Sequence, residues 1–326
     1  MTERKRVFSG IQPTGNVHIG NYIGAGRNYV ALQDSYETIY CVVDLHAMTV
    51  PYDPEELRKG KAHMARMLLA MGIDPKRSLL YYQSDVPQHA ELSWVLGCLA
   101  SMGQLERMTQ YKEKSDKSGQ YFGLFAYPVL MAADILIHRV HAVPVGEDQT
   151  QHLELTRDLA ERFNHRFGEL FPVPEAIIPE VGARIMSLTD PTSKMSKSDP
   201  SPKSRVNLTD TPDEIAAKIK SAVTDTGSEV SYDPENKPGI SNLLEIFSAF
   251  DGRSIDELVE EYRSSGYGRF KAAVAEAVIA GVQPIQERYA SLTDAEVAQV
   301  MEASAEKARE MAAGTMELVR DAVGLD

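Results

Sequence analysis

Short apolar runs alternate with helical patterns along the first half of the chain. The runs RVFSGI, TIYCVVDLHAMT, SLLYYQSD and HAVPVG are rich in β-branched and aromatic residues and predict strands. Between these runs, apolar residues recur with the period of a helix. Strands that alternate with helices imply right-handed crossovers and a parallel sheet with helices on both faces. We therefore expect an α/β fold with a Rossmann-like, doubly wound parallel sheet.

The second half of the chain has a different pattern. The stretch FPVPEAIIPE is proline-rich, and we expect it to connect elements and not to form one. Helical signals follow it. The segments SIDEL and TDAEV are capping boxes that pair Ser254 with Glu257 and Thr293 with Glu296. The chain is therefore expected to end in a C-terminal α-helical domain.

Composition narrows the class of protein. The 326 residues are 43% hydrophobic and 25% charged, which suits a sizeable packed core. A net charge of −13 argues against a protein that coats nucleic acid through bulk electrostatics, so we expect no DNA partner. No run of eighteen apolar residues and no signal peptide are evident, so we expect no membrane partner. Cys41 and Cys98 both lie in apolar runs, and two buried free thiols suit a cytoplasmic location.

The glycine-rich segment SGIQPTGNVHIGNYIGA follows the first predicted strand and enters a helix. In a doubly wound sheet this is where phosphates bind, at a helix N-terminus beyond the carboxyl ends of the strands. Gly10, Gly15 and Gly20 allow close approach of a ligand, and His18 and Asn21 add polar side chains. The spacing matches neither a dinucleotide fingerprint nor a P-loop, so an ordinary turn remains an alternative interpretation.

The polar segment TSKMSKSDPS lies in a locally basic part of the chain. A solvated loop is the ordinary interpretation of such a lysine–serine run. Chemistry offers a sharper one, because a triphosphate needs mobile cations that tighten as charge builds on departing pyrophosphate. Lys194 and Lys197 on a flexible loop suit that role, and with the glycine turn they would hold a nucleotide from two sides.

Two of these segments carry a resemblance to a known family. PTGNVHIGN and KMSKS resemble the two signatures of the class I aminoacyl-tRNA synthetases, with Asn21 where many members have a second histidine. Within that class, YPVLMAADIL, VPVGEDQTQHLELTRDLAERFN, GARIMSLTDPTSKMSKSDP and KPGISNLL look like the bacterial tryptophanyl branch, in which this asparagine is usual. The resemblance runs nearly end to end. It implies a homodimeric tryptophan–tRNA ligase that makes tryptophanyl-adenylate and pyrophosphate from L-tryptophan and ATP, then charges tRNA(Trp).

The resemblance also assigns residues to ATP. It implies catalytic roles for Gln12, His18, Asn21, Lys114, Lys194 and Lys197. The ATP-binding set that it implies is Gln12, Pro13, Thr14, His18, Gly20, Asn21, Gly146, Glu147, Asp148, Ile185, Lys194, Met195, Ser196, Lys197 and Ser198. Mg²⁺ is expected on the triphosphate, held by phosphate and water, so no protein metal-ligand cluster is needed.

The helical segment LFAYPVLMAADILIH places Tyr127, Met131 and Asp134 on one face. A core stripe is the ordinary alternative. Burying an acid without a donor is costly, however, and an indole N–H is such a donor. A site of this kind would reject phenylalanine by about 10⁴-fold, because the acid would be left unsatisfied. By the resemblance, the tryptophan-binding residues are Phe8, His46, Tyr127, Met131, Asp134, Val143, Val145 and Gln149.

The resemblance divides the chain into a catalytic domain over residues 1–190 and, over residues 191–326, the KMSKS loop with a helical domain that reads the anticodon. The last helix has the length to pack back on the catalytic domain. Three alternatives stay open: a tyrosyl-tRNA synthetase, a small-molecule nucleotidylyltransferase, and a non-catalytic paralogue that binds RNA or protein. The helical part is acidic overall, so contact with tRNA would depend on a few local bases.

Overall fold

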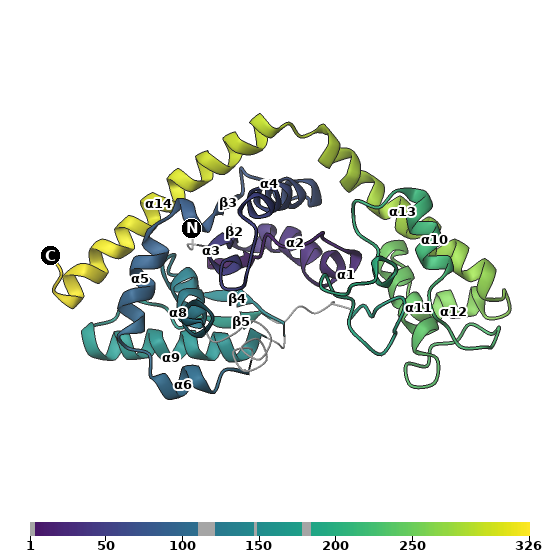
Figure 1. Cartoon of the computed structure of the whole chain (residues 1–326), viewed down its shortest axis with the longest axis horizontal. Helices are drawn as coiled ribbons and strands as arrows, with labels where there is room; N and C mark the ends of the chain where they lie inside the picture. The colour runs from purple at the N-terminus through teal and green to yellow at the C-terminus, as the bar shows by residue number, and fades with distance from the viewer. Residues whose placement is uncertain (1–3, 110–120, 147–148, 178–183) are drawn as a thin grey trace.

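A parallel sheet forms the centre of the molecule in the computed structural model, which describes residues 4–109, 121–146, 149–177 and 184–326 (Figure 1). Its strand order is β3-β2-β1-β4-β5, and every pairing between neighbours is parallel. The strands are β1 (Arg6–Ile11), β2 (Glu37–Val42), β3 (Ser78–Tyr82), β4 (Ala142–Pro144) and β5 (Glu175–Ile177). The predicted fold class is confirmed by this sheet and by the helices that surround it.

Strand β5 was not expected, because it lies inside the proline-rich stretch that was predicted only to connect. Ala142 to Pro144 of β4 pair with Glu175 to Ile177. Proline cannot donate to a sheet ladder and is tolerated next to edge strands. Because β5 is the last strand of the sheet, the neighbouring prolines do not prevent its pairing.

Strand β2 is shorter than the run TIYCVVDLHAMT predicted. It ends at Val42, and the short helix α3 (Asp44–Ala47) follows at once. The Asp44 carboxylate accepts hydrogen bonds from the backbone N–H and the hydroxyl of Ser84. The chain therefore leaves the sheet here, which brings His46 to the carboxyl end of the strands.

Both faces of the sheet are covered, as the alternation in β2 shows. Ile39 and Cys41 are buried against one set of helices, and Tyr40 and Val42 against the other. The helices of this half are α1 (Ile19–Asn21), α2 (Arg27–Ser35), α4 (Pro54–Met71), α5 (Gln88–Gly97), α6 (Met102–Glu106), α8 (Phe122–Leu136) and α9 (Thr150–Phe167). A π-helical turn, Tyr22–Gly26, joins α1 to α2. Cys41 is a buried thiol as predicted, but Cys98 is exposed.

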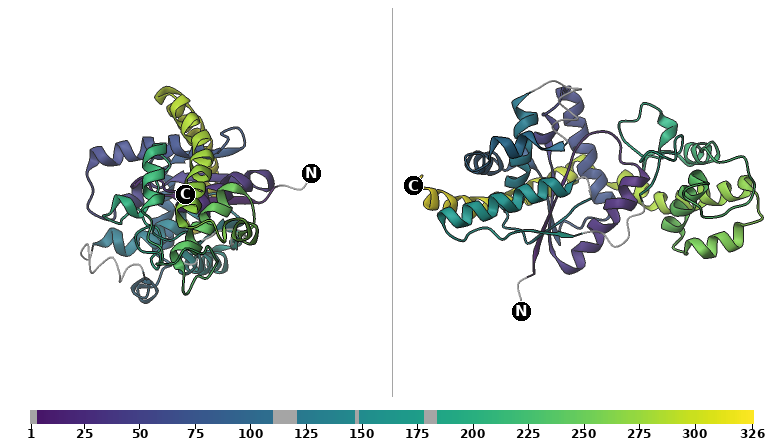
Figure 2. Two further views of the ribbon diagram at one scale, coloured as in Figure 1. Left: turned by 90° about the vertical axis from the view of Figure 1, so that its right-hand side faces the viewer. Right: turned by 90° about the horizontal axis from the view of Figure 1, so that it is seen from below.

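The C-terminal part is helical, as predicted, and its helices before the last one lie to one side of the sheet in Figures 1 and 2. Its helices are α10 (Pro212–Lys220), α11 (Pro238–Asp251), α12 (Ile255–Tyr262), α13 (Tyr267–Ser291) and α14 (Asp294–Val323). Both predicted capping boxes form at the starts of α12 and α14. Helix α14 runs back past β3 and α5, where Arg320 pairs with Glu91 at 2.7 Å.

None of the helices in the described ranges combines the length and the apolar character that a membrane crossing requires.

Candidate active site

A cavity of about 460 Å³ opens at the carboxyl ends of β1 and β4. Strand β1 lies between β2 and β4, so the chain order reverses at this point of the sheet, and ligands of open α/β sheets bind at such points. All eight residues predicted for the amino acid line the cavity: Phe8, His46, Tyr127, Met131, Asp134, Val143, Val145 and Gln149. Gln12 and Gly146, which were predicted for ATP, line it too.

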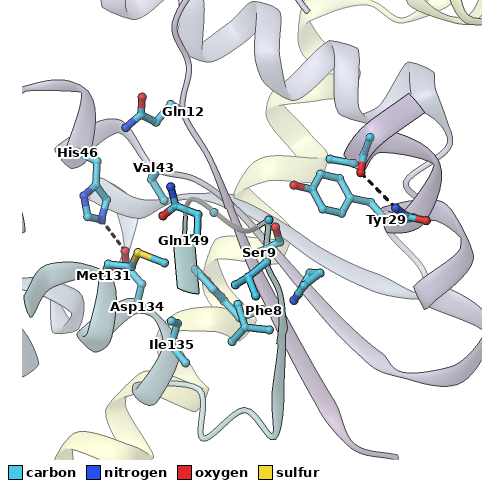
Figure 3. A pocket seen from close by; sticks show the side chains of 18 of the residues that line it. Phe8, Ser9, Gln12, Tyr29, Val43, His46, Met131, Asp134, Ile135 and Gln149 are labelled. Atoms are coloured by element: carbon cyan, nitrogen blue, oxygen red, sulfur yellow. Dashed lines mark hydrogen bonds and ion pairs between the residues drawn. The ribbon is translucent and has the colours of Figure 1, made fainter. Parts of the chain in front are cut away.

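Asp134 is the best-connected polar group of this cavity. Figure 3 shows the His46 ring pointing at it, and His46 Nε2 lies 2.8 Å from Oδ2. Gln83 Nε2 donates to Oδ1 at 2.7 Å, and His89 Nδ1 lies 2.8 Å from the same oxygen, although less well aligned. Burial by itself would raise the pKa of Asp134, but the contacts from His46 and His89 hold it at about 2. The carboxylate is therefore ionised although it is 1% exposed.

These contacts overturn the premise that Asp134 needs an indole as its donor. An ionised carboxylate has about four acceptor positions. Within the described chain, Oδ1 accepts from Gln83 and has His89 Nδ1 close by in poor alignment, and Oδ2 meets His46, so Oδ2 keeps an acceptor position for a further N–H. A substrate without an N–H would leave that position empty but would not strand a bare buried charge. The expected rejection of phenylalanine by an unsatisfied acid is correspondingly weaker.

His18 and Asn21 lock the start of α1 together. His18 Nδ1 accepts from the backbone N–H of Asn21 at 3.2 Å, and Asn21 Oδ1 accepts from the backbone N–H of His18 at 3.3 Å. Burial, with Lys197, Arg205 and Lys194 nearby, lowers the pKa of His18 to about 3. The ring is therefore neutral, and because Nδ1 accepts, its proton is on Nε2. Asn21 therefore has a structural role at this position, because it and His18 cap each other's backbone N–H groups.

The KMSKS segment meets the glycine turn directly. Lys197 Nζ donates to the carbonyl oxygen of Thr14 at 3.0 Å. Gly15 has φ +64°, and a Cβ there would lie 3.3 Å from the Lys197 side chain. Burial lowers the pKa of Lys197 to about 8. The turn and the loop are therefore in contact at the Lys197 side chain, although they are far apart in sequence.

The rest of the KMSKS segment folds as a hairpin-like pair with the residues before it. Met195 N–H donates to the Ile185 carbonyl at 3.0 Å, and both side chains are buried. Ile185 also lies 3.5 Å from the Cβ position of Gly20. Lys194 is exposed, and the hydroxyls of Ser196 and Ser198 are 2.9 Å apart. The segment thus packs beside α1, with Lys194 turned to solvent.

Several predicted residues are placed differently or fall outside the structure's range. Pro13 and Thr14 line a separate cavity beside α4 and not the cavity of Asp134. Lys114, Glu147 and Asp148 lie outside the described residues, so their predicted roles stay predictions.

The sequence did not reveal every wall of the cavity. Ser9, Gly24, Asn28, Tyr29 and Ile135 line it as well. Gly24 and Asn28 lie one helical turn apart just after the glycine-rich turn, so their spacing was a usable signal. The polar partners of Asp134 are His46, Gln83 and His89, which come from three other elements. No local sequence pattern marks them as partners of one carboxylate.

The comparisons with known proteins agree with this geometry. A family model of class I tRNA synthetases (W and Y) matches residues 1–283. The chain belongs to the class I tRNA synthetases. It is 55% identical to the tryptophan–tRNA ligase of Caldanaerobacter subterraneus subsp. tengcongensis over 322 residues, 98% of each chain. The family expected from PTGNVHIGN and KMSKS is therefore confirmed, and the chain is an aminoacyl-tRNA ligase.

Two solved class I synthetases share the whole fold. The tryptophanyl-tRNA synthetase of Mycoplasma pneumoniae matches with a TM-score of 0.89 at 34% identity, over 99% of this chain and 98% of that one. The enzyme of Campylobacter jejuni, solved with ADP and tryptophan, matches with a TM-score of 0.86 at 36% identity, over 98% and 99%. Both synthetases are named for tryptophan, as is the ligase relative.

Proposed function

We propose that this chain is the tryptophan–tRNA ligase of its cell, which forms tryptophanyl-adenylate from L-tryptophan and ATP and then charges tRNA(Trp). The observation that carries the proposal is a single cavity with two kinds of wall. Asp134 and Tyr127, predicted for the amino acid, and Gln12 and Gly146, predicted for ATP, all line this cavity. An amino acid and a nucleotide can therefore meet in one space. As an enzyme that supplies translation, it would act in the cytoplasm.

The first chemical step needs positioning and charge stabilisation more than covalent help from the protein. The carboxylate of tryptophan attacks the α-phosphorus of ATP, and pyrophosphate leaves. Lys197 and Lys194 would stabilise the charge that builds on the departing pyrophosphate. His18, neutral and with its proton on Nε2, would offer a hydrogen bond without adding charge.

Magnesium is expected to arrive with the triphosphate, where it would neutralise phosphate charge. In the described ranges no group of three or more His, Cys, Asp or Glu side chains is arranged to hold a metal ion. Mg²⁺ is commonly held by phosphate oxygens and water, and we expect the same here.

Recognition of tryptophan would depend on shape and on one acceptor. Phe8, Val143 and Val145 offer an apolar slot for the ring, and Met131 can adapt to it. The open acceptor position on Asp134 Oδ2 would take the indole N–H. His46, Tyr127 and Gln149 would address the amino and carboxylate groups, as the resemblance implies.

A homodimer would cover the apolar surface formed by Met48, Trp94, Met102 and Phe122, here called the α5–α8 surface. Trp94 is 75% exposed and Phe122 is 79% exposed. They border a hollow of about 540 Å³, and exposed apolar areas of this kind mark protein interfaces. Tyr127 lines both this hollow and the amino-acid cavity. A second copy on this surface would therefore support one wall of the tryptophan site.

The helical part would bind tRNA and read its anticodon, with the boundary at residue 190. Some of its bases are already paired. Lys218 meets Asp210 at 2.5 Å, and Arg253 pairs with Asp251 and Glu261. Contact with phosphate would have to compete with these ion pairs.

Charging of tRNA tests the proposal. Purified wild-type protein should attach tryptophan to tRNA(Trp) in the presence of ATP and Mg²⁺, and Lys197→Ala should do so far more slowly. Equal charging by the two proteins would remove the KMSKS loop from the mechanism. Absence of charging by the wild type, in a preparation that is folded and binds ATP, would indicate a non-catalytic relative.

A further inference from the structure

A buried chain of side chains extends from Asp134 into the core, away from the cavity. His89 Nδ1 lies 2.8 Å from Asp134 Oδ1, and His89 Nε2 lies 2.9 Å from the Tyr81 hydroxyl. The same hydroxyl lies 2.6 Å from His138 Nε2. None of these side chains is more than 1% exposed. They come from α5, from β3 and from the turn after α8, so only the folded sheet brings them together.

The chain has a defined order of protons. His89 Nδ1 must carry a proton, because an unprotonated nitrogen would place its lone pair 2.8 Å from a carboxylate oxygen. With a single ring proton, on Nδ1, His89 Nε2 is an acceptor and Tyr81 donates to it. A hydroxyl has one proton, so Tyr81 must accept from His138 Nε2. Each donor in the series thus points toward Asp134.

The far end of the chain carries an unusual cost. His138 Nδ1 is buried and has no hydrogen-bond partner among the described residues. Buried polar atoms are rarely left unpaired in folded proteins, and each exception calls for an explanation. Burial also lowers the pKa of His138 well below its ordinary value, so the ring is neutral. Burying the polar atoms of Tyr81 and His138 costs more free energy than burying apolar side chains of the same size. The hydrogen bond between them is therefore expected to have a function.

We propose that Tyr81, His89 and His138 form a positioning network for recognition of the indole N–H. The network fixes the His89 tautomer, and His89 and Gln83 together occupy Oδ1 of Asp134. The donor from the substrate is thereby directed to Oδ2, beside His46. The three network residues act through Asp134 and do not line the cavity. This inference rests on the proposed function. It adds the residues that orient Asp134 so that the enzyme distinguishes substrates with an indole N–H from those without one.

The test is Tyr81→Phe, which removes one oxygen and keeps the buried ring. Its kinetics are measured by ATP–pyrophosphate exchange with two substrates: tryptophan, and β-(3-benzothienyl)alanine, which has sulfur in place of the indole N–H. We expect the KM for tryptophan to rise about tenfold with kcat nearly unchanged. The KM for the sulfur analogue should stay at the wild-type value, since it has no N–H to direct.

Tyr82→Phe is the matched control. Tyr82 is the next residue of the same strand, and its ring lies under Lys61, 4.5 Å from Nζ to the ring centroid. Phenylalanine retains that ring, and no part of the network involves the Tyr82 hydroxyl. Wild-type kinetics are expected with both substrates.

Substitution of His89 separates positioning from packing. In His89→Asn an amide N–H can take the place of Nδ1–H, whereas His89→Leu offers no donor. We expect His89→Asn to retain most of the preference for tryptophan over the sulfur analogue, and His89→Leu to lose about tenfold of it.

The outcomes separate this inference from the proposed function. If wild-type protein fails to exchange with tryptophan, the proposed function is wrong. If the wild type exchanges but Tyr81→Phe raises both KM values equally, or raises neither, the network has only a packing role and the inference is wrong. A Tyr81→Phe protein that does not fold leaves the His89 pair to decide between these results.

Discussion

Lys197 and Thr14 are 183 positions apart in the sequence, yet the Lys197 ammonium donates a hydrogen bond to the Thr14 carbonyl over 3.0 Å. The contact joins the KMSKS loop to the glycine turn. It places a cation where the phosphates of ATP are expected. The carbonyl is a weak partner for an ammonium, so a triphosphate can replace it readily.

Replacement of Lys197 tests the role of that cation. We expect Lys197→Ala to lower kcat for ATP–pyrophosphate exchange by about 10²–10³-fold, because a charge that stabilises the transition state is lost. The KM for tryptophan should change little, since Asp134 and its cavity are untouched. Lys203→Ala, which removes an exposed lysine of the same basic segment, is the control and should leave kcat unchanged.

ATP binding should weaken at alkaline pH. Burial lowers the pKa of Lys197 to about 8 in the free protein, whereas a bound triphosphate favours the charged form. Below pH 7 the lysine is charged and binding is unaffected. Above pH 8 the charged fraction falls, so the KM for ATP should rise, at most about tenfold per pH unit. Lys197→Arg stays charged and should abolish the rise; an identical rise in that variant would assign it to another group.

Asp134→Asn is a cleaner test of the amino-acid site than removal of the side chain. Asp134→Ala would leave His46, Gln83 and His89 without their buried acceptor, a loss of about 3–5 kcal/mol of folding free energy. Asparagine fills the same space, but its side-chain NH₂ group faces some of the groups that donate to the carboxylate and cannot accept from them. We expect kcat/KM for tryptophan to fall by about 10²-fold with the KM for ATP unchanged. Unchanged use of tryptophan would mean that the indole is recognised elsewhere.

Gly60 sets the distance between α4 and the glycine turn. A Cβ at this position would lie 2.3 Å from the carbonyl oxygen of Pro13, so one backbone segment must move. We expect Gly60→Ala to raise the KM for ATP at least tenfold and to cost about 1–3 kcal/mol of stability. Gly314→Ala in α14 meets nothing within 4 Å and should stabilise the helix by about 0.5–1 kcal/mol. Thermal unfolding and exchange kinetics of the pair check both results.

The α5–α8 surface should hold the dimer together. We expect Trp94→Lys to shift the protein from dimer to monomer in sedimentation velocity, because a charge replaces a large apolar side chain at the interface. The KM for tryptophan should rise with it, since Tyr127 lies between the surface and the cavity. Leu318→Lys changes an exposed apolar residue of α14 outside this surface, and it should stay dimeric. A dimeric Trp94→Lys would place the interface elsewhere.

Most of the sheet was predictable from short apolar runs that end at glycines or polar residues. Strands β1, β2 and β3 were visible because each is a short segment rich in apolar aliphatic and aromatic residues. Strand β5 was not, because three residues beside prolines carry no strand signal, and only pairing with β4 makes them one. The turn into α3 was also hidden, since it depends on a contact between Asp44 and Ser84, which lies just after β3.

The site was predictable where it follows one helix or one motif, and not where it depends on tertiary contacts. The shared face of Tyr127, Met131 and Asp134 follows from helical spacing. The donors Gln83 and His89 lie 51 and 45 positions before Asp134, and nothing in their own neighbourhoods marks them. The carboxylate therefore looked unsatisfied from the sequence, although the fold satisfies most of it.

The most direct test of the account is amino-acid-dependent ATP–pyrophosphate exchange by the purified protein with each of the twenty amino acids in turn. We expect rapid exchange with L-tryptophan and background exchange with tyrosine, phenylalanine and the others. Exchange with tyrosine but not with tryptophan would contradict it, because the cavity of Asp134 would then serve a phenol and not an indole.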